Sequence, residues 1–328
     1  MVGKLIVESQ YPIQPLDLDR VSTYPLASRK SKVHSEMFGK PLDGSDSIPA
    51  FISKLPRILA AEGLRTLIRA ILYARASSKP IIWAMGGHVI KVGLGPVIND
   101  LIENGFVTAI ALNGSGAIHD FEIALCGSTS EEVADGLGSG KFGMARETSE
   151  YMNGAISAGA GQGTGLGEIL GRAIVNGTPE GAAYPFQQMS ILATAYRNRV
   201  PVTVHVAIGT DIIHAHPSAS GKAIGEVTQI DFRLFCTSVR DLDGGGVYLN
   251  VGSAVLLPEV FLKAVSVVRN LENQLDEFTT ANLDFIQHYR AAENVLKRPT
   301  QNGGQSVALT GHHEIMIPLI AAALKGSL

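Results

Sequence analysis

The chain has 328 residues, of which 45% are hydrophobic and 17% charged, and its formal net charge is −3 at pH 7. A chain of this length can bury a substantial core, and without an excess of Lys and Arg it is unsuited to a nucleic-acid partner. Cys126 and Cys236 are too few for a disulfide framework. Neither a signal peptide nor an apolar run of about 18 residues is recognisable, so the sequence predicts a cytoplasmic protein with no membrane partner.

The beginning of the chain predicts an arm rather than a folded core. Residues 1–50 are mixed in character, with scattered Pro and Ser, which is typical of an extended segment. Residues 51–328 predict a single large domain. Two consecutive helices, over residues 48–61 and 64–76, are expected ahead of the first strand.

A strand, a glycine turn and a helix follow in that order. Residues 81–85 form a short apolar run, as in a strand buried on both faces of a parallel sheet. The run ends at Gly86 and Gly87, which predict a tight turn. Pro96 suits the first position of the next helix, because its missing N–H would be unpaired there anyway.

A second unit of the same kind comes next. Residues 106–112 predict a strand, residues 113–116 a tight turn, and residues 117–125 a helix. Because the carboxyl ends of neighbouring parallel strands meet at one edge of a sheet, both glycine turns are expected beside one ligand site. Backbone N–H groups at the helix starts favour a phosphate or a carboxylate there.

The remaining chain alternates helices and strands, which predicts an α/β, Rossmann-like doubly wound, mostly parallel sheet flanked by helices. Thr129 or Ser128 is expected to cap a short helix over 129–136. Helices are expected over 147–175, with glycine interruptions, and over 184–199, 219–241, 258–271 and 312–324, and strands over 201–207, 246–251 and 306–309. The glycines between 154 and 167 could form a mobile lid, a phosphate nest or close helix contacts.

The first turn of the helix after the second glycine turn carries His119, Asp120 and Glu122. His119 and Glu122 are three residues apart on one helix face, so the carboxylate could orient or charge the imidazole. This pattern predicts a general acid or base, with all three residues as catalytic candidates. The alternative is a helix end whose acidic side chains complement the helix dipole.

The first glycine turn, with His88 and the nearby Lys91, could approach a dinucleotide closely. It does not spell G-x-G-x-x-G, and a plain tight turn between strand and helix is the alternative. Lys91 or Arg146 could hold a substrate carboxylate.

Two histidine-rich stretches could suggest metal. Asp211, His214 and His216 follow the strand over 201–207. No third ligand has a recognisable spacing, so we interpret them as substrate contacts and predict no metal. His312 and His313 open an apolar helix and are interpreted as capping residues.

Three blocks, at residues 80–125, 198–217 and 246–261, resemble deoxyhypusine synthase in the same order, within a likeness over roughly residues 60–265. The resemblance implies a Rossmann-like fold, an NAD cofactor and a homotetramer, a dimer of dimers, with sites at dimer interfaces. The matching turns would contact the cofactor through Asn113, Gly114, Ser115, Gly116, Asn250, Gly252 and Ser253, together with Gly86, Gly87 and His88. The matching loop after the third strand implies substrate contacts at Asp211, His214 and His216.

The sequence also departs from that family. The family's two adjacent glutamates fall on Ile118 and His119, and residues 230–242, which match the segment of its imine-forming lysine, contain no lysine. An imine needs a deprotonatable amine. Residues 117–122 are instead similar to a short run in archaeal ornithine cyclodeaminase and LOR/SDH-type proteins.

Together these features predict an NAD-dependent enzyme that transfers a hydride from a small amine or amino-acid substrate and is not a true deoxyhypusine synthase. One alternative is a non-catalytic nucleotide-binding oligomer. Another is an unusual deoxyhypusine or homospermidine synthase-type transferase with a relocated lysine, such as Lys222 or Lys263.

Overall fold

A computed structural model describes residues 10–327 and divides the chain into two units. Residues 10–38 form an exposed segment with two short 3-10 turns, η1 (Leu26–Ser28) and η2 (Ser35–Met37). The larger unit begins at Gly39, so residues 39–50 of the expected arm belong to it, while residues 1–9 lie outside the described residues.

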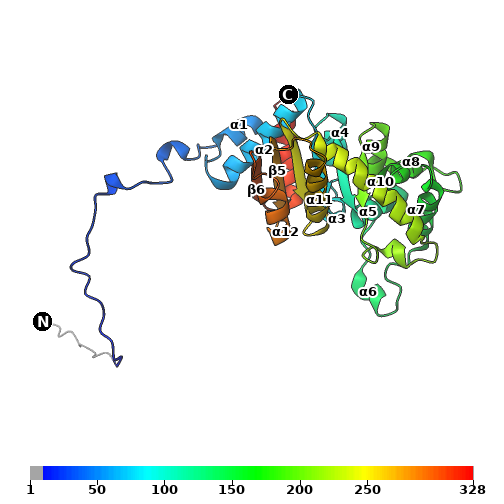
Figure 1. The fold of residues 1–328 in the computed structure, drawn as a ribbon, viewed down its shortest axis with the longest axis horizontal. Helices are drawn as coiled ribbons and strands as arrows, with labels where there is room; N and C mark the ends of the chain where they lie inside the picture. The colour runs from blue at the N-terminus through cyan, green and yellow to red at the C-terminus, as the bar shows by residue number, and fades with distance from the viewer. Residues whose placement is uncertain (1–9, 328) are drawn as a thin grey trace. The chain divides into compact units, whose positions relative to one another are not determined.

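The larger unit is built on a six-stranded, wholly parallel sheet with the order β3-β2-β1-β4-β5-β6 (Figure 1). The strands are β1 (Ile81–Met85), β2 (Ala109–Asn113), β3 (Val202–His205), β4 (Gly246–Val251), β5 (Phe278–Asp284) and β6 (Gln305–Thr310). The order reverses between β1 and β4, which is the Rossmann arrangement and confirms the predicted fold class.

Helices cover both faces of the sheet (Figure 1). The first half of the larger unit contains α1 (Ile48–Lys54), α2 (Leu59–Ala76), α3 (Gly87–Lys91), α4 (Gly95–Glu103), α5 (Gly114–Cys126), α6 (Val133–Leu137), α7 (Arg146–Gly159) and α8 (Leu166–Asn176). The second half contains η3 (Gln187–Met189), α9 (Ile191–Arg197), η4 (Ile212–Ala215), α10 (Gly221–Arg240), α11 (Leu256–Asn270), α12 (Tyr289–Ala291), the π-helical η5 (Ala292–Lys297) and α13 (His313–Lys325). Across residues 10–327, every helix is too short or too polar to cross a membrane.

The central strand β1 shows why the apolar runs form buried strands. All five of its residues are buried, and they alternate between two core clusters on opposite faces of the sheet. Trp83 packs with α2, α4 and α13, and its Nε1–H donates to the carbonyl of Phe106 at 3.2 Å. Ile82 packs on the other face with α10 and α11. A parallel strand covered on both faces needs a continuous apolar sequence, which is what residues 81–85 provide.

Side chains of α10 form hydrogen bonds with backbone groups on the outer edge of β3, which is an end strand of the sheet. The Asp231 carboxylate accepts hydrogen bonds from the backbone N–H groups of Val204 at 2.7 Å and Gly167 at 3.0 Å. The Thr228 hydroxyl donates to the carbonyl of Val204 at 2.7 Å and accepts from the N–H of Val206 at 3.2 Å. The outward backbone groups of Val204 and the N–H of Val206 are therefore bonded without another strand. Burial raises the pKa of Asp231 to about 7.

Several elements were not expected from the sequence, among them the strand β5 and the short helix α3. The strand β5 contains Thr280 and Asn282, both fully buried, and their polar side chains obscure the apolar pattern of a central strand. Asn282 is accommodated by hydrogen bonds with Asn250 and Gln287. The short helix α3 follows β1 where only a turn was predicted.

Several helix boundaries also differ from the predictions. The helix expected over 48–61 ends at Lys54, and the helix expected over 184–199 begins at Ile191. The helix expected from residue 129 begins at Val133, with Glu132 as its N-cap, so neither Thr129 nor Ser128 caps it. The helix expected over 147–175 is two helices, α7 and α8, and Gly165 and Gly167 before and within α8 pack against Asp231 and the backbone of Val202. Close contact, one of the interpretations of this glycine series, holds for these two positions.

Candidate active site

The turns after β1, β2 and β4 meet at the carboxyl edge of the sheet. The N–H of Gly86 donates to the carbonyl of Val251 at 3.0 Å, and a Cβ on Gly86 would lie 2.2 Å from the carbonyl oxygen of Gly252. A Cβ on Gly87 would lie 2.5 Å from the Ser115 hydroxyl and 2.9 Å from Cδ2 of His119. Only glycine allows these approaches. The two glycine turns therefore lie at the same edge, in direct contact rather than on either side of a crevice.

A pocket of about 220 Å³ lies beside this contact. One wall comes from α3 and α5, a second from residues 130–142 and a third from the loop after β3. The lining residues are Lys91, Ser115, Ile118, His119, Glu122, Ser130, Glu131, Val133, Phe142, Thr210, Asp211 and Ile212. Five of the predicted site residues, Lys91, Ser115, His119, Glu122 and Asp211, are thus brought together.

Residues 127–145, which include α6, form one side of the pocket, and we call them the cover segment. In Figure 1, α6 lies apart from the layers around the sheet, at the bottom of the view. The Glu131 carboxylate accepts from the N–H of Gly143 at 2.8 Å, which ties the two ends of this segment together. Gly143 in turn lies against Ile212, where a Cβ would come within 2.8 Å of that side chain.

A threonine lies between the histidine and the glutamate of α5. Nδ1 of His119 is 2.7 Å from the Thr129 hydroxyl, and this hydroxyl donates a short hydrogen bond to the Glu122 carboxylate. Nδ1 of His119 is 3.9 Å from the same carboxylate, beyond direct hydrogen-bond distance. The expected orientation of His119 by Glu122 therefore operates through Thr129.

These bonds define the tautomer of His119. A carboxylate only accepts hydrogen bonds, so the single hydroxyl proton of Thr129 points at Glu122. The Thr129 oxygen must then accept a proton from Nδ1 of His119, which leaves Nε2 with a free lone pair. Burial, with a smaller contribution from Lys91, lowers the pKa of His119 to about 4. His119 is therefore a neutral imidazole at pH 7, with its basic nitrogen unpaired among the described residues.

The loop after β3 brings Asp211 to the start of α5. A Cβ on Gly114 would lie 2.0 Å from the Asp211 carboxylate, and the Asn113 side chain already accepts from the N–H of Gly116 at 2.8 Å. Asp211 and Asn113 therefore occupy the part of the helix start where a phosphate or a carboxylate was expected. Burial raises the pKa of Asp211.

His214 lies next to Asp211 but does not line the pocket. Its Nδ1 accepts from the N–H groups of Gly209 at 3.1 Å and Asp211 at 3.4 Å, so Nε2 carries the proton. That Nε2 is buried without a hydrogen-bond partner, 3.8 Å from the Asp211 carboxylate. His216 lies further along the same loop and bonds to Ser218 at 2.7 Å. Neither histidine is placed to contact a substrate in this pocket.

Asp120 does not face the pocket, although it was a catalytic candidate. Its buried carboxylate accepts from the Ser190 hydroxyl at 2.5 Å and from the N–H groups of Ile191 at 2.7 Å and Leu192 at 3.1 Å. It therefore holds the start of α9 against α5. Burial raises the pKa of Asp120 to about 6 against these opposing hydrogen bonds.

The predicted cofactor residues of β4 are mostly internal. The Asn250 side chain is fully buried and donates to the carbonyl of Ser253 at 2.9 Å and to the Asn282 side chain at 2.7 Å. The Ser253 hydroxyl accepts from the N–H of Leu257 at 3.3 Å at the start of α11. Of the turn residues after β4, Ser253 is buried and Gly252, which lies next to Gly86, is half-buried.

The histidines at the far end of the same edge pack on one another. His88 lies against His313, with ring centroids 5.3 Å apart, and against Phe285 at 5.7 Å. Nε2 of buried His313 bonds to the carbonyl of Leu283 at 3.0 Å. His312 occupies the N-cap position of α13 but makes no side-chain cap bond, so the expected capping is wrong. Among residues 10–327, no three His, Cys, Asp or Glu side chains are grouped to hold a metal ion.

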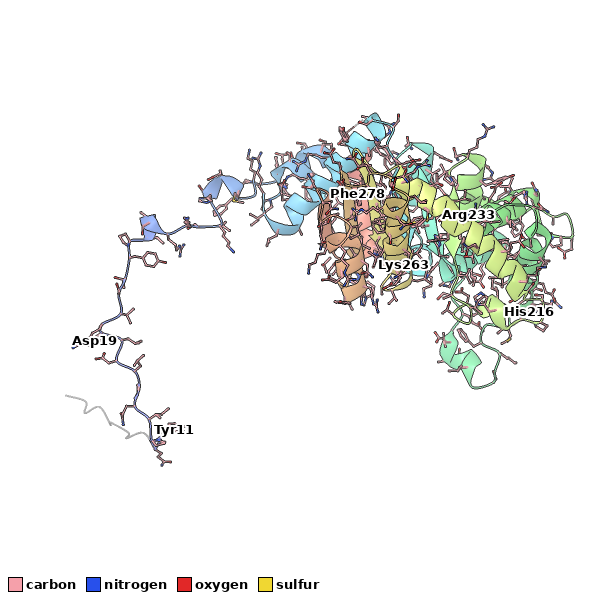
Figure 2. All side chains as sticks on the ribbon, viewed as in Figure 1. Tyr11, Asp19, His216, Arg233, Lys263 and Phe278 are labelled. Atoms are coloured by element: carbon pink, nitrogen blue, oxygen red, sulfur yellow. The ribbon has the colours of Figure 1, made fainter. Side chains whose placement is uncertain are left out.

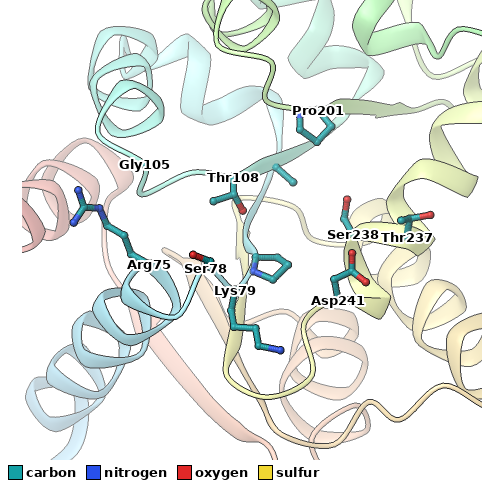
Figure 3. Close-up of a pocket in the computed structure, with 11 residues that line it drawn as sticks. Arg75, Ser78, Lys79, Gly105, Thr108, Pro201, Thr237, Ser238 and Asp241 are labelled. Atoms are coloured by element: carbon teal, nitrogen blue, oxygen red, sulfur yellow. The ribbon is translucent and has the colours of Figure 1, made fainter.

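A larger depression of about 630 Å³ lies at the opposite, amino edge of the sheet (Figure 3). Its cations do not converge, because the side chains of Arg75 and Lys79 point in different directions in Figure 3. Arg75 donates to the carbonyl of Asn104 at 3.1 Å and Lys79 to that of Asp243 at 2.6 Å. None of the predicted site residues lines this depression.

Sequence reasoning missed the pocket residues of the cover segment. Thr129 was interpreted as a helix cap, yet it bonds to His119, and Glu131 of the same segment lines the pocket. Thr148, which donates to the Glu122 carboxylate at 3.1 Å, lies 26 residues further along the chain. Spacing along the sequence carries no signal for contacts of this kind, since they depend on how loops return to the sheet.

Comparisons with known proteins give matches by structure only. No family model and no curated protein matches the chain. A candidate LOR/SDH protein from Methanococcus maripaludis S2 is 16% identical with a TM-score of 0.48, over 86% of this chain and 71% of that one. A candidate deoxyhypusine synthase from Entamoeba histolytica is 12% identical with a TM-score of 0.47, over 87% and 96%.

A third solved structure is the ternary complex of AgrE with ornithine and NAD⁺, which is 12% identical with a TM-score of 0.49. The match covers 83% of this chain and 34% of AgrE, so the chain spans about a third of that protein's length. At these identities the likenesses concern the fold alone, and the chemistry of the pocket has to be argued from its own residues.

Proposed function

We propose that this chain is an NAD-dependent enzyme that removes a hydride from a small amine or amino-acid substrate held in the pocket beside His119. The observation that supports it most directly is the free lone pair on Nε2 of His119, in a pocket shared with Lys91 and Asp211. A neutral imidazole fixed in one tautomer is a ready general base.

The residues around the pocket have distinct roles in this proposal. When bound, NAD⁺ supplies the acceptor for the hydride that leaves the substrate carbon. Nε2 of His119 takes the proton from the adjacent N–H or O–H group, so that a carbon–nitrogen or carbon–oxygen double bond forms. The Glu122 carboxylate, acting through Thr129, stabilises the imidazolium that results.

The charges and size of the pocket favour a small amino acid or amine. The ammonium of Lys91 is exposed in the pocket wall and could pair with a carboxylate, while Glu131 and Asp211 could receive an ammonium group. A volume of about 220 Å³ is below the range of drug-sized ligand pockets, roughly 300–1,000 Å³. The substrate would therefore be only a few bonds long.

The same volume is too small for a whole dinucleotide, and Asp211 fills the start of α5. Only the nicotinamide end of NAD would approach His119. The remainder would lie along the carboxyl edge toward half-buried Gly252, where the strand order reverses between β1 and β4. A reversal of this kind is where open α/β sheets bind their ligands.

Calorimetric titration of the full chain with NAD⁺, and separately with NADP⁺, tests the cofactor. Saturable binding of one of them is expected, and no heat and no thermal shift with either would overturn the proposal. Turnover is then measured by NADH absorbance against a panel of amino acids and diamines. Binding without turnover of any of them would favour the non-catalytic oligomer, and sedimentation would test the tetramer that the family resemblance implies.

A further inference from the structure

Among residues 10–327, Thr129 is the side chain of the cover segment that hydrogen-bonds to the proposed base. We propose that Thr129 is a positioning residue that couples two events. When residues 127–145 close over the pocket, His119 is prepared for proton transfer at the same time. The catalytic part rests on the proposed function, whereas the coupling between segment and tautomer rests on the hydrogen bonds alone.

Thr129 provides the link between two groups that cannot otherwise bond. His119 and Glu122 both belong to α5, yet Nδ1 of His119 is 3.9 Å from the carboxylate. The Thr129 hydroxyl lies between them, 2.7 Å from Nδ1, and its proton goes to Glu122. Without this hydroxyl, Nδ1 has no hydrogen-bond acceptor among residues 10–327, and the preference for the tautomer with a free Nε2 is lost.

The other end of the relay is fixed independently of the cover segment. The second oxygen of Glu122 accepts from the hydroxyl of Thr148, a buried residue of α7. Glu122 therefore stays in place through α5 and α7 when the cover segment moves. Thr129 is the one member of the relay that departs with the segment.

The backbone of the cover segment is suited to such a movement. Gly127 ends α5 in the left-handed region at φ +74°, and Gly140 and Gly143 adopt φ +70° and +77° near the other end. Ser130, next to Thr129, also has a left-handed φ of +70°, which a non-glycine residue rarely adopts. The closed arrangement therefore depends on its contacts, chiefly the bond of Thr129 to His119 and the fit of Gly143 against Ile212.

The proposal explains how the pocket could admit a substrate without leaving a competent base in contact with water. When residues 127–145 lift, Ser130, Glu131 and Phe142 leave the pocket wall, and Thr129 leaves His119 at the same time. The imidazole then exchanges its proton between both nitrogens. Closure over a substrate restores the wall and the free lone pair on Nε2 together.

The tautomer can be measured directly by long-range ¹H–¹⁵N correlation spectra of ¹⁵N-histidine-labelled full-length protein at pH 7. His119 is assigned by the signal that His119→Gln removes. We expect a protonated Nδ1 and a free Nε2 in the wild type and in Thr129→Ser, and a mixed or reversed tautomer in Thr129→Val. Thr148→Val removes the other hydroxyl on Glu122 and is expected to leave the tautomer unchanged. An unchanged tautomer in Thr129→Val would overturn the proposal.

Hydrogen exchange measures the other half of the coupling. Thr129→Val should raise amide exchange across residues 127–145 by about tenfold, which corresponds to the loss of one hydrogen bond. Thr129→Ser and Thr148→Val should not. Equal exchange in all three variants would show that Thr129 does not hold the segment closed. Neither experiment uses NAD, so the outcome of both is independent of whether the proposed enzyme activity is found.

Discussion

Nδ1 of His119 lies 2.7 Å from the hydroxyl oxygen of Thr129. This one contact connects a helix of the folded core with a loop that covers the pocket, and it determines which nitrogen of the imidazole can act as a base. A histidine whose second nitrogen is held by a fixed partner is typical of sites that move protons.

The pH dependence of turnover should report the lowered pKa of His119. The base is active when neutral, so kcat/KM is expected to fall only as the pH drops through about 4, rather than near the ordinary histidine value of 6.5. An initial-rate profile from pH 3.5 to 8 measures this, with stability at each pH checked by fluorescence. An acid limb near 6.5 would show that His119 is exposed and charged in the working enzyme.

Replacement of His119 by Gln should separate binding from chemistry. We expect turnover to fall by about 10²–10⁴-fold, the usual contribution of a general base, while the calorimetric Kd for NAD⁺ stays nearly unchanged. Asp120→Asn is the matched comparison, because Asp120 bonds to the start of α9 and should affect stability rather than proton transfer. Equal turnover in wild type and His119→Gln would remove this residue from the mechanism.

The contact between the turns of β1 and β4 should not tolerate a side chain. Gly86→Ala places a Cβ 2.2 Å from the Gly252 carbonyl oxygen and is expected to destabilise the fold by about 3 kcal/mol, the upper range for overpacking. Gly225→Ala, in open space within α10, should instead stabilise it by about 0.5–1 kcal/mol. Urea unfolding of both variants makes the comparison, and similar effects would contradict the close approach.

Asp231 should make stability depend on pH with an unusual sign. Its pKa of about 7 in the folded chain exceeds the ordinary value of 3.8. Between these two pH values the folded state binds more protons than the unfolded state. The contribution of Asp231 to the free energy of unfolding therefore declines as the pH rises from 3.8 to about 7. Asp231→Asn removes the titration and keeps an acceptor for Val204 and Gly167. Urea unfolding at pH 5 and pH 8 should show the wild type losing stability relative to this variant.

The transferase alternative makes a chemical prediction that differs from ours. Lys263 pairs with Glu259 on α11 at 2.6 Å, and Figure 2 shows it well separated from the His216 loop. Lys222 does not line the pocket either, whereas Lys91 does. Borohydride added to the chain with NAD⁺ and spermidine should therefore give no adduct at any lysine by mass spectrometry. An adduct at Lys91 would favour an imine-forming transferase over our proposal.

Much of the fold could be predicted because burial on both faces leaves a clear apolar pattern. The strands at Ile81–Met85 and Gly246–Val251 were predicted with their observed bounds, and together they enclose the reversal of strand order. The strand at Phe278–Asp284 could not be predicted in the same way. Its buried Thr280 and Asn282 read as polar, and only the pairing with Asn250 shows how the sheet accommodates them.

The site could be predicted only as far as local spacing extends. His119 and Glu122 share one helix turn, so their joint role could be proposed from the sequence. Asp120 lies on the same turn but points at α9, and no pattern distinguishes the two directions. Thr129 reaches His119 because the cover segment folds back over α5, which depends on tertiary contacts that one sequence does not reveal.

The pairing of β3 by Asp231 and Thr228 has a consequence for how copies of this chain could associate. An end strand with free N–H and carbonyl groups is a template for strand addition by a neighbouring molecule. Here α10 occupies those groups on Val204 and Val206. A neighbouring copy that continued the sheet past β3 would therefore first have to displace the side chains of Asp231 and Thr228.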